Sequence, residues 1–517
     1  MRIAFLPLDE RPVTRDAFLR LAAIAGADVA TPAREQLGSL KRPADVEAMW
    51  AWLEGPGADA DLVIASAELL IYGGLVPSRV GREPLDRCLA LAARWRDARR
   101  AAPRRRVYLS ASNLRLPNSA DGTEEPDYWT EFGPQIFACS FHEDRYEATG
   151  DPASRDRAAA AAAGVPETVL ADVRWRRARN LAVLRRLVEL AGAEVFDGLL
   201  IGQDDAAEYG WTRRDLRAVT AAVEEHRAAS RAWVTYGTDE LTARLLARAV
   251  VTGRDARPAV RVTYSAPAHR DAIPRYEGQA LDLTVTSHIV TAGCRRAEAA
   301  PPSPDLSLFV HNSPGDQLEA PDQQPYPPAE LDSFFEALAD ATASGTPCAV
   351  ADVRYSNGAD RTLVARLLGA PRASGVAAYG GWNTMSNALG MALAQAVVSA
   401  RPVAHPAVDG AGRTVGEHAN RDFTILRLLD DWGYQANVRQ RLAREVLPRY
   451  PGARSSDIGP AYAACAEAAR RWLQETCAPH VAASFGVPIA VGPVGFPWNR
   501  LFHVALDIQV GTSRSTP

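Results

Sequence analysis

The 517-residue chain is predicted to be an α/β protein in which buried strands alternate with helices. Short apolar runs such as Gly198-Leu-Leu-Ile201 are typical of strands that are buried on both faces. Segments that favour helix separate these runs over most of the chain, which is the alternation of an α/β fold. The runs also end in polar residues, and α/β proteins carry their chemistry at the carboxyl ends of the strands.

The alternation is clearest in the first half of the chain. Strands are expected at 2–8, 27–31, 61–66, 106–111, 198–201 and 232–236, and helices at 14–26, 45–53, 157–164, 167–192 and 212–229. Thr212 is expected to be the N-cap of the helix that follows the central strand. Residues 118–150 have little periodicity, so a lid or a binding loop is expected there.

The second half adds strands and then becomes helical. Strands are expected at 306–310, 349–353 and 376–379, and period-two alternation predicts two half-buried strands at 260–264 and 283–287. From about residue 411 the pattern favours helices. We therefore expect a first α/β half at 1–255, inserted strands plus a second α/β half at 256–410, and a helical C-terminal region at 411–517.

Two architectures fit this order of elements. The first expectation is a (β/α)8-like barrel with insertions and a helical C-terminal region. The alternative is two doubly wound α/β domains facing a cleft, because the order of strands within a sheet cannot be read from one sequence.

Composition excludes several classes of protein. The formal net charge is −4, so nothing indicates binding to nucleic acid. No apolar stretch has the roughly 18 residues of a membrane span, and Asp9, Glu10 and Arg11 interrupt the N-terminus too early for a signal peptide. The six cysteines are scattered, without a C-x-x-C pair. The sequence thus predicts a cytoplasmic protein without a nucleic-acid or membrane partner.

The candidate site begins with Asp204 and Asp205, which follow the central strand. Two neighbouring carboxylates repel each other, so one is expected to be protonated or bound to a partner. Other strand ends carry further polar and aromatic residues, and if they face one side they form a pocket of carboxylates and amides with an aromatic wall. The residues expected to bind substrate are Asp9, Arg11, Tyr72, Tyr209, Asp239, Glu240, Asn357, Asp360, Trp382 and Asn383.

This mixture suits a sugar-like ligand, whose hydroxyl groups pair with acids and amides while its ring packs on an aromatic face. Paired carboxylates are also what cleavage of a glycosidic bond requires. We therefore predict a glycoside hydrolase-like enzyme for a small glycoside or amino-sugar glycoside, with Asp204 orienting the nucleophile or stabilising charge and Asp205 as the acid. The pair Asp239-Glu240 is an alternative choice for the catalytic acids.

Two other functions stay open. No cofactor motif is found, and no two histidines have a metal-ligand spacing such as i, i+4, so no cofactor and no metal site are predicted. A carboxylate-rich site for a metal-dependent hydrolase is nevertheless an alternative. The third function is a sugar- or metabolite-binding protein without turnover.

Several ordered motifs resemble a bacterial family known as domain of unknown function 4127. They are Pro7-Leu-Asp-Glu-Arg-Pro-Val13, Tyr72-Gly-Gly-Leu-Val-Pro-Ser-Arg79, Gln203-Asp-Asp-Ala-Ala-Glu-Tyr-Gly210, Gly237-Thr-Asp-Glu240, Asn357-Gly-Ala-Asp360 and Gly381-Trp-Asn-Thr384. The first motif departs from the family pattern Asp-Asp-Arg-Pro-Val, since this chain has Asp9-Glu10-Arg11. This resemblance implies no activity.

A looser resemblance is to retaining hexosaminidases on (β/α)8 barrels, which use adjacent acids at a strand end. In those enzymes one acid orients the 2-acetamido group of the substrate as the nucleophile, and the other is the general acid. Both Asp204-Asp205 and Asp239-Glu240 match this arrangement at the level of a short motif.

Overall fold

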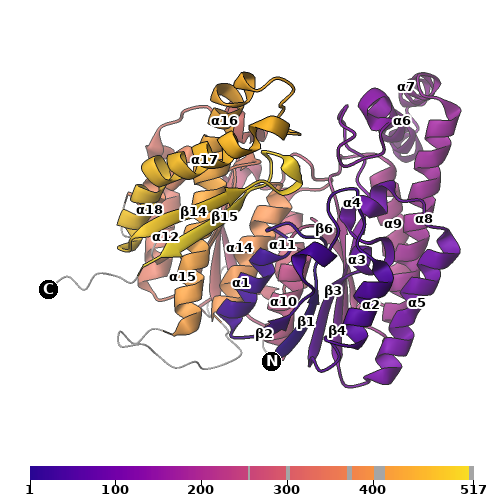
Figure 1. Cartoon of the computed structure of the whole chain (residues 1–517), viewed down its shortest axis with the longest axis horizontal. Helices are drawn as coiled ribbons and strands as arrows, with labels where there is room; N and C mark the ends of the chain where they lie inside the picture. The colour runs from indigo at the N-terminus through magenta and orange to yellow at the C-terminus, as the bar shows by residue number, and fades with distance from the viewer. Residues whose placement is uncertain (254–256, 298–302, 370–374, 401–413, 512–517) are drawn as a thin grey trace. The chain divides into compact units, whose positions relative to one another are not determined.

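A computed structural model describes residues 1–253, 257–297, 303–369, 375–400 and 414–511 as an α/β protein (Figure 1). Its contacts divide the chain into two compact units. The first unit comprises Met1–Glu10, Asp28–Leu245 and Tyr276–Gln279, and the second comprises Arg11–Ala27, Leu246–Arg275 and Ala280–Pro517. The predicted domain boundaries after 255 and after 410 fall outside the described residues and stay predictions.

The first unit contains a six-stranded parallel sheet in the order β2-β1-β3-β4-β5-β6. The strands are β1 (Arg2–Leu6), β2 (Asp28–Ala30), β3 (Leu62–Ser66), β4 (Arg106–Asn113), β5 (Gly198–Gln203) and β6 (Ala232–Tyr236). Because the strand order reverses at β1, this is the order of an open, doubly wound sheet. Asn113, Gln203 and Tyr236 pair in register, so the carboxyl ends of β4, β5 and β6 lie at one edge.

Helices connect these strands by crossovers. They are α2 (Val46–Glu54), α3 (Ala67–Tyr72), α4 (Leu75–Val80), α5 (Leu85–Ala101), α6 (Trp129–Thr149), α7 (Pro152–Ala163), α8 (Glu167–Gly192) and α9 (Trp211–Glu225). The crossovers from β2 to β6 all run in the same direction across the sheet, and Figure 1 shows α2, α3, α5 and α8 together on one side of it. Their apolar faces form a core with the strands that includes Trp50, Trp95 and Phe196.

The second unit contains a five-stranded parallel sheet in the order β13-β11-β9-β7-β8. The strands are β7 (Ala259–Tyr264), β8 (Arg295–Arg296), β9 (Leu306–Asn312), β11 (Cys348–Val353) and β13 (Ala378–Gly380). Counted along the chain within each unit, the first five strands of both sheets have the same order, 2-1-3-4-5.

The α/β class is confirmed, whereas a closed barrel is not. In the described part of the chain, each large sheet is open, with β2 and β6 at the edges of the first and β8 and β13 at the edges of the second. Two separate open sheets fit the alternative expectation of doubly wound units. The barrel expectation failed because a sequence shows that strands and helices alternate but not which strands are neighbours.

The second unit also holds helices and two short sheets. The helices include α1 (Asp16–Ala25), α11 (Leu281–Thr291), α12 (Asp332–Ala343), α13 (Arg361–Leu368) and α14 (Met385–Ala400), and α10 (Leu241–Thr252) spans the division between the units. Strands β10 (Leu318–Glu319) and β12 (Tyr355–Ser356) form a short parallel pair.

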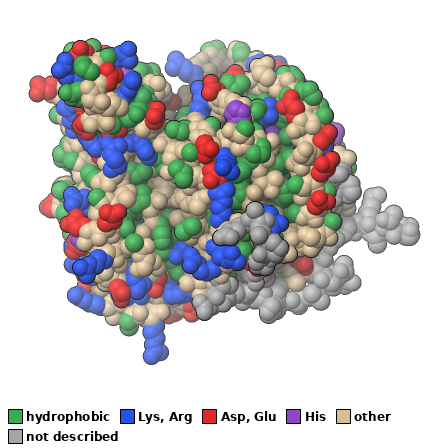
Figure 2. All heavy atoms as spheres, turned by 180° about the vertical axis from the view of Figure 1, so that it is seen from behind, with side chains coloured by type: hydrophobic (Ala, Val, Ile, Leu, Met, Phe, Trp, Pro, Cys, Tyr) green, Lys and Arg blue, Asp and Glu red, His purple; other side chains and the backbone are tan. Residues whose placement is uncertain are grey.

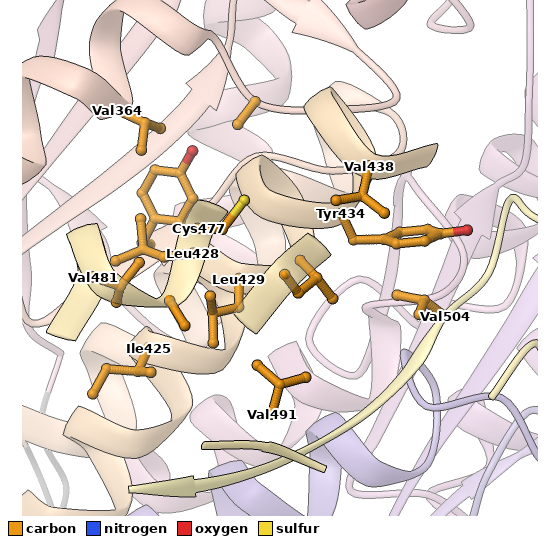
Figure 3. Packing of buried hydrophobic residues seen from close by; sticks show 14 of the residues in the cluster. Val364, Ile425, Leu428, Leu429, Tyr434, Val438, Cys477, Val481, Val491 and Val504 are labelled. Atoms are coloured by element: carbon orange, nitrogen blue, oxygen red, sulfur yellow. The ribbon is translucent and has the colours of Figure 1, made fainter. Parts of the chain in front are cut away.

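The C-terminal region is mainly helical, as predicted, but ends in an antiparallel pair of strands. Its helices are α15 (Val415–Arg427), the π-helix η6 (Leu428–Val438), α16 (Arg439–Glu445), α17 (Tyr462–Trp472), the π-helix η9 (Leu473–Cys477) and α18 (Ala478–Phe485). Strands β14 (Ile489–Gly495) and β15 (Ala505–Val510) follow them. Figure 3 shows part of the core that joins these elements, including Ile425, Leu428, Tyr434, Val481 and Val491.

Three local predictions were wrong. Residues 283–287 belong to helix α11, in which Leu281, Thr284, Val285 and His288 are buried at helical spacing despite the β-branched side chains. Most of the expected loop at 118–150 is helix α6, which packs its apolar face into a cluster with Trp211. Helix α9 begins at Trp211 with Gly210 as its N-cap, so Thr212 lies inside the helix.

The surface carries charges of both signs. Acidic and basic side chains both occur over the face shown in Figure 2, in keeping with a net charge of −4. Among the helices that the structure describes, we find none with the length and apolarity that a membrane span requires.

The close approach of β5 to the loop after β6 gives a first testable prediction. A Cβ atom at Gly202 would lie 2.0 Å from the carbonyl oxygen of Gly237, so Gly202→Ala must displace backbone. We expect this variant to lose about 3 kcal/mol of stability in urea unfolding, the upper part of the usual range for overpacking. Gly164→Ala is the control, since its Cβ would have its nearest neighbour at 3.5 Å. Equal midpoints for the two variants would contradict this packing.

Candidate functional site

The acid pair Asp204-Asp205 lies where β5 leaves the sheet of the first unit. The side chain of Gln203, the last residue of β5, fixes this exit. Its carbonyl oxygen accepts a hydrogen bond from Asn113 Nδ2 at 2.6 Å, and its Nε2 donates to the carbonyl oxygen of Asp204, also at 2.6 Å. Hydrogen bonds of Gln203 therefore connect the ends of β4 and β5 immediately before the two aspartates.

A double glycine places the first partner of the acid pair. Gly73 has φ = 84°, and a Cβ atom there would lie 2.7 Å from the carbonyl oxygen of Ala44, so a side chain is not accommodated. The turn through Gly73 and Gly74 leads into α4, which presents the buried side chain of Arg79. Arg79 Nη2 contacts Asp204 Oδ2 at 2.5 Å.

Arg115, which follows β4, contacts the second aspartate. Its Nη1 lies 3.2 Å from Asp205 Oδ2, and its Nε donates to Glu125 Oε1 at 2.7 Å. Glu124 bridges the two arginines, with Oε2 at 2.8 Å from Arg79 Nη1 and 3.3 Å from Arg115 Nη2. We call these six residues (Arg79, Arg115, Glu124, Glu125, Asp204 and Asp205) the arginine–carboxylate cluster.

Four carboxyl groups contact two guanidinium groups in this cluster, and the pKa is raised for two of the four. Burial, and secondly the charge of Asp204, raise the pKa of Asp205 to about 7. Burial also raises the pKa of Glu125. Asp204 instead has a guanidinium partner at 2.5 Å and accepts the backbone N–H of Asp205 through Oδ1 at 2.9 Å. The pair thus combines a stabilised carboxylate with a neighbouring acid that is half protonated near neutral pH.

A further buried acid lies close to the cluster. Glu68, just after β3, accepts hydrogen bonds from Ser66 Oγ and from the backbone N–H of Ser112, each at 2.6 Å. Burial raises its pKa, and the charge of Asp204 adds to the effect. Glu68 follows β3, which is a neighbour of β1, where the strand order reverses, and α/β sheets commonly bind ligands at such a place.

The cluster borders a small hollow of about 30 Å³, enough for about one water molecule. Arg79, Arg115 and Glu125 line it together with the aromatic residues Tyr128 and Trp129. The side chain of Asp205 is 25% exposed, so the acid of the pair reaches the surface.

The other predicted residues of the first unit have varied surroundings. Asp9 is buried just after β1. Tyr72 is buried with its ring 4.9 Å from the guanidinium carbon of Arg179. Tyr209 is half-buried, and its ring meets that of Phe141 edge-on at 5.6 Å.

The alternative acid pair, Asp239-Glu240, stands just before α10. Glu240 is fully buried, and its Oε1 accepts from Arg244 Nη2 at 3.0 Å, while its Oε2 accepts the backbone N–H of Thr238 at 3.2 Å. Because Arg244 is also fully buried, Glu240 has a structural role in neutralising it.

The remaining predicted residues belong to the second unit. Arg11 lies 4.5 Å from the centre of the Trp498 ring and 3.2 Å from His503 Nε2. Trp382 packs against His503 at 5.8 Å and lines a pocket of about 230 Å³. Charged residues of both signs also line this pocket, including Asp16, Arg20, Arg427, Asp430 and Asp507.

Asn357 and Asn383 are brought together within the second unit. Both have left-handed backbones, with φ = 64° and 71°, and the N–H of Asn357 donates to the carbonyl oxygen of Asn383 at 2.9 Å. Asp360 is buried at the N-cap of α13 and contacts His311. The predicted substrate-binding set is thus divided between the two units, and its convergence into one pocket stays a prediction.

Sequence reasoning did not assign a role to Glu68, Arg79, Arg115, Glu124 or Glu125. One signal was available, because a buried pair of neighbouring acids requires nearby positive charge. Arg115 follows the polar end of β4, and Arg79 follows the double-glycine turn. Within the described ranges, no three His, Cys, Asp or Glu residues are placed to hold a metal ion.

Comparison with curated proteins and with solved structures gives no match. The similarity to hexosaminidases therefore stays at the level of a motif. Residues 3–507 match the model of a family described as "Protein of unknown function (DUF4127)", which extends over nearly the whole chain. The resemblance seen in the motifs is thereby confirmed, and the chain belongs to this family.

Proposed function

We propose that the first unit carries the active site of a glycoside hydrolase-like enzyme that cleaves a small glycoside or an amino-sugar glycoside. One observation carries the proposal. Asp204 is paired with Arg79 at 2.5 Å, whereas the pKa of its neighbour Asp205 is raised to about 7. Two adjacent carboxyl groups with opposite protonation are the chemical requirement for acid-assisted cleavage of a glycosidic bond.

Each aspartate has its own part in this reaction. Asp205 is protonated in a large fraction of molecules near pH 7 and donates its proton to the leaving oxygen. Asp204, paired with Arg79, either stabilises the positive charge that develops on the sugar or orients a 2-acetamido group. Arg115 holds the Asp205 side chain in place through the contact at 3.2 Å.

The surroundings of the pair support a sugar-like substrate. Asp205 reaches the surface, and Tyr128 and Trp129 line the hollow beside the cluster. Because the hollow holds only about one water molecule, a sugar ring would lie outside it, at the exposed part of Asp205, where carboxyl groups of the cluster accept hydrogen bonds from its hydroxyl groups. The pair Asp204-Asp205 is preferred to Asp239-Glu240, because Glu240 already neutralises the buried Arg244.

Two other functions remain as outcomes of the tests. A metal-dependent hydrolase is less well supported, because guanidinium groups already contact the carboxylates that would bind the ion. Under that alternative, chelation of divalent ions would abolish activity and magnesium or calcium would restore it. A binding protein without turnover would retain ligand in calorimetry but release no product.

Replacement of the two aspartates separates their roles. Asp205→Asn should reduce turnover of glycosides with poor leaving groups by about 10²–10⁴-fold, the usual share of acid–base catalysis, and should affect activated aryl glycosides much less. Asp204→Asn should impair both kinds of substrate, since it removes charge stabilisation. Initial rates on matched alkyl and aryl glycosides measure the difference.

Asp97→Asn is the control for these variants, because Asp97 is a well-exposed aspartate of the same unit. Equal and mild losses with both substrate classes would mean that Asp204 and Asp205 bind ligand without transferring a proton.

The raised pKa of Asp205 also predicts a pH-dependent stability. The pKa rises from 3.8 to about 7 on folding, so the folded state retains a proton that the unfolded chain loses. The resulting stabilisation is complete below about pH 4 and is lost as the pH rises to about 7. Asp205→Asn cannot ionise, so its stability relative to the wild type should increase between pH 4 and pH 7, by at most about 4 kcal/mol.

Urea unfolding of the wild type and Asp205→Asn across this pH range tests the shift without any substrate. Asp97→Asn should show no such trend, because Asp97 is largely in solvent. A constant difference between Asp205→Asn and the wild type would mean that Asp205 ionises normally, and the general-acid assignment would fail.

A further inference from the structure

The second unit contains a serine, a histidine and an aspartate in an unbroken hydrogen-bonded row. Ser265 directly follows β7, and His311 lies near the end of β9. These strands are neighbours at the point where the order of the sheet reverses, since β8 lies on the other side of β7. Asp360 joins them from the N-cap of α13. Side chains at such a reversal commonly face a ligand in α/β sheets.

The distances in this row are those of ordinary hydrogen bonds. Ser265 Oγ lies 2.9 Å from His311 Nδ1, and His311 Nε2 lies 2.9 Å from Asp360 Oδ2. The backbone N–H of Asn312 donates to Ser265 Oγ at 3.1 Å and fixes the hydroxyl from a second side. The three side chains are therefore held in one geometry.

The protons in the row can be assigned from chemistry. Burial lowers the pKa of His311, so the ring is neutral and carries one proton. The Asp360 carboxylate can only accept, which places that proton on Nε2. His311 Nδ1 is then an acceptor, and at 2.9 Å it lies nearer to Ser265 Oγ than the competing carbonyl oxygen of Asn312 at 3.3 Å, so the hydroxyl donates to the ring. A serine bound in this way to a base is set up to lose its proton on attack.

Other residues keep Asp360 anionic and fixed. Although burial opposes it, the pKa of Asp360 is lowered by the hydrogen bonds that it accepts from its neighbours. Tyr326 donates its hydroxyl proton to Oδ2 at 2.7 Å, and the N–H of Thr362 donates to Oδ1 at 2.7 Å. Arg354 Nε lies 3.5 Å from Oδ2. A carboxylate with these partners orients the imidazole and stabilises its charged form during a reaction.

The serine is the least buried of the three residues in the row. His311 and Asp360 are 0% and 1% exposed, whereas Ser265 is half-buried. The ring of His311 also packs against Phe334 at 6.0 Å, which shields the base from water on that side. A substrate would reach the row from the side of the hydroxyl group, and its leaving oxygen must come within hydrogen-bond distance of His311 Nδ1, which lies 2.9 Å from Ser265 Oγ, to take the proton.

We propose that Ser265, His311 and Asp360 form a second catalytic site, which hydrolyses carboxylic esters through an acyl-serine. Ser265 Oγ bonds to the carbonyl carbon while its proton passes to His311 Nδ1. The bond from that carbon to the alcohol oxygen breaks, and the alcohol leaves with the proton from Nδ1. Water then attacks the acyl-serine, gives a proton to Nδ1, and the carboxylic acid departs as Ser265 regains its proton. Asp360 is a positioning residue, since it acts through His311.

The experiment uses the full chain and a fluorophosphonate, which modifies activated serines covalently. We expect the adduct on Ser265 in peptide mass spectrometry, and an initial burst of nitrophenol with p-nitrophenyl acetate. Ser265→Ala should lose both signals. Ser313→Ala is the matched control, because Ser313 is a nearby serine that is half-buried like Ser265 but bonds only to the backbone of its own turn in the described contacts, and it should keep both.

Asp360→Asn tests the positioning role separately from folding. Asparagine is also a good N-cap, so α13 keeps its cap, but an amide that donates to Nε2 forces the imidazole proton onto Nδ1. The rate of modification should fall by about 10³–10⁴-fold, while the melting curve shows whether the variant is folded. An absent adduct on Ser265 in the wild type, or an unchanged rate in folded Asp360→Asn, would overturn the proposal.

Discussion

The ion pair between Arg79 and Asp204 is the interaction on which the first unit's site depends. Both side chains are largely buried, and removal of two charges from water costs several kcal/mol per ion unless other groups compensate. The compensation comes from Glu124 on Arg79 and from the backbone N–H of Asp205 on Asp204. Burial, and secondly the charge of Asp204 beside it, raise the pKa of Asp205.

Glycines make this ion pair possible. Gly73 has backbone within 2.7 Å of where a Cβ atom would lie, and Gly202 has the Gly237 carbonyl oxygen at 2.0 Å. The first glycine turns the chain so that α4 presents Arg79, and the second lets β5 approach the loop after β6 just before Asp204. The chemistry of the cluster thus depends on two positions where the chain has no room for a side chain.

The sequence predicted the strands better than their arrangement. Runs such as 198–201 are apolar along their whole length, and buried parallel strands leave that signal. Residues 283–287 were wrongly predicted to be a strand, because threonine and valine favour strands. The burial of Thr284, Val285 and His288 instead follows a helical period. Strand order has no local signature, so the choice between a barrel and two open sheets depended on pairings that only the structure supplies.

The candidate sites show the same limit. Asp204 and Asp205 were selected because they are adjacent in sequence at a strand end. Arg79 and Arg115 lie 125 and 90 residues away from their partners, so their contacts with the aspartates cannot be inferred from spacing. Ser265 and His311 were missed for a related reason, since they become neighbours only through the pairing of β7 with β9.

Each unit places a buried titratable group beside an aspartate, but the two aspartates act on the charge of their neighbours in opposite directions. In each, a buried group that burial keeps neutral lies beside an aspartate: Asp205 beside Asp204, and His311 beside Asp360, although Asp360 by itself favours the charged form of His311. A neutral acid is able to give a proton, and a neutral imidazole is able to take one. The fixed anion also stabilises the charged imidazolium that forms on His311 in the second unit. The two sheets share a strand order, and under both proposals the proton is transferred by a buried neutral group that lies beside an aspartate.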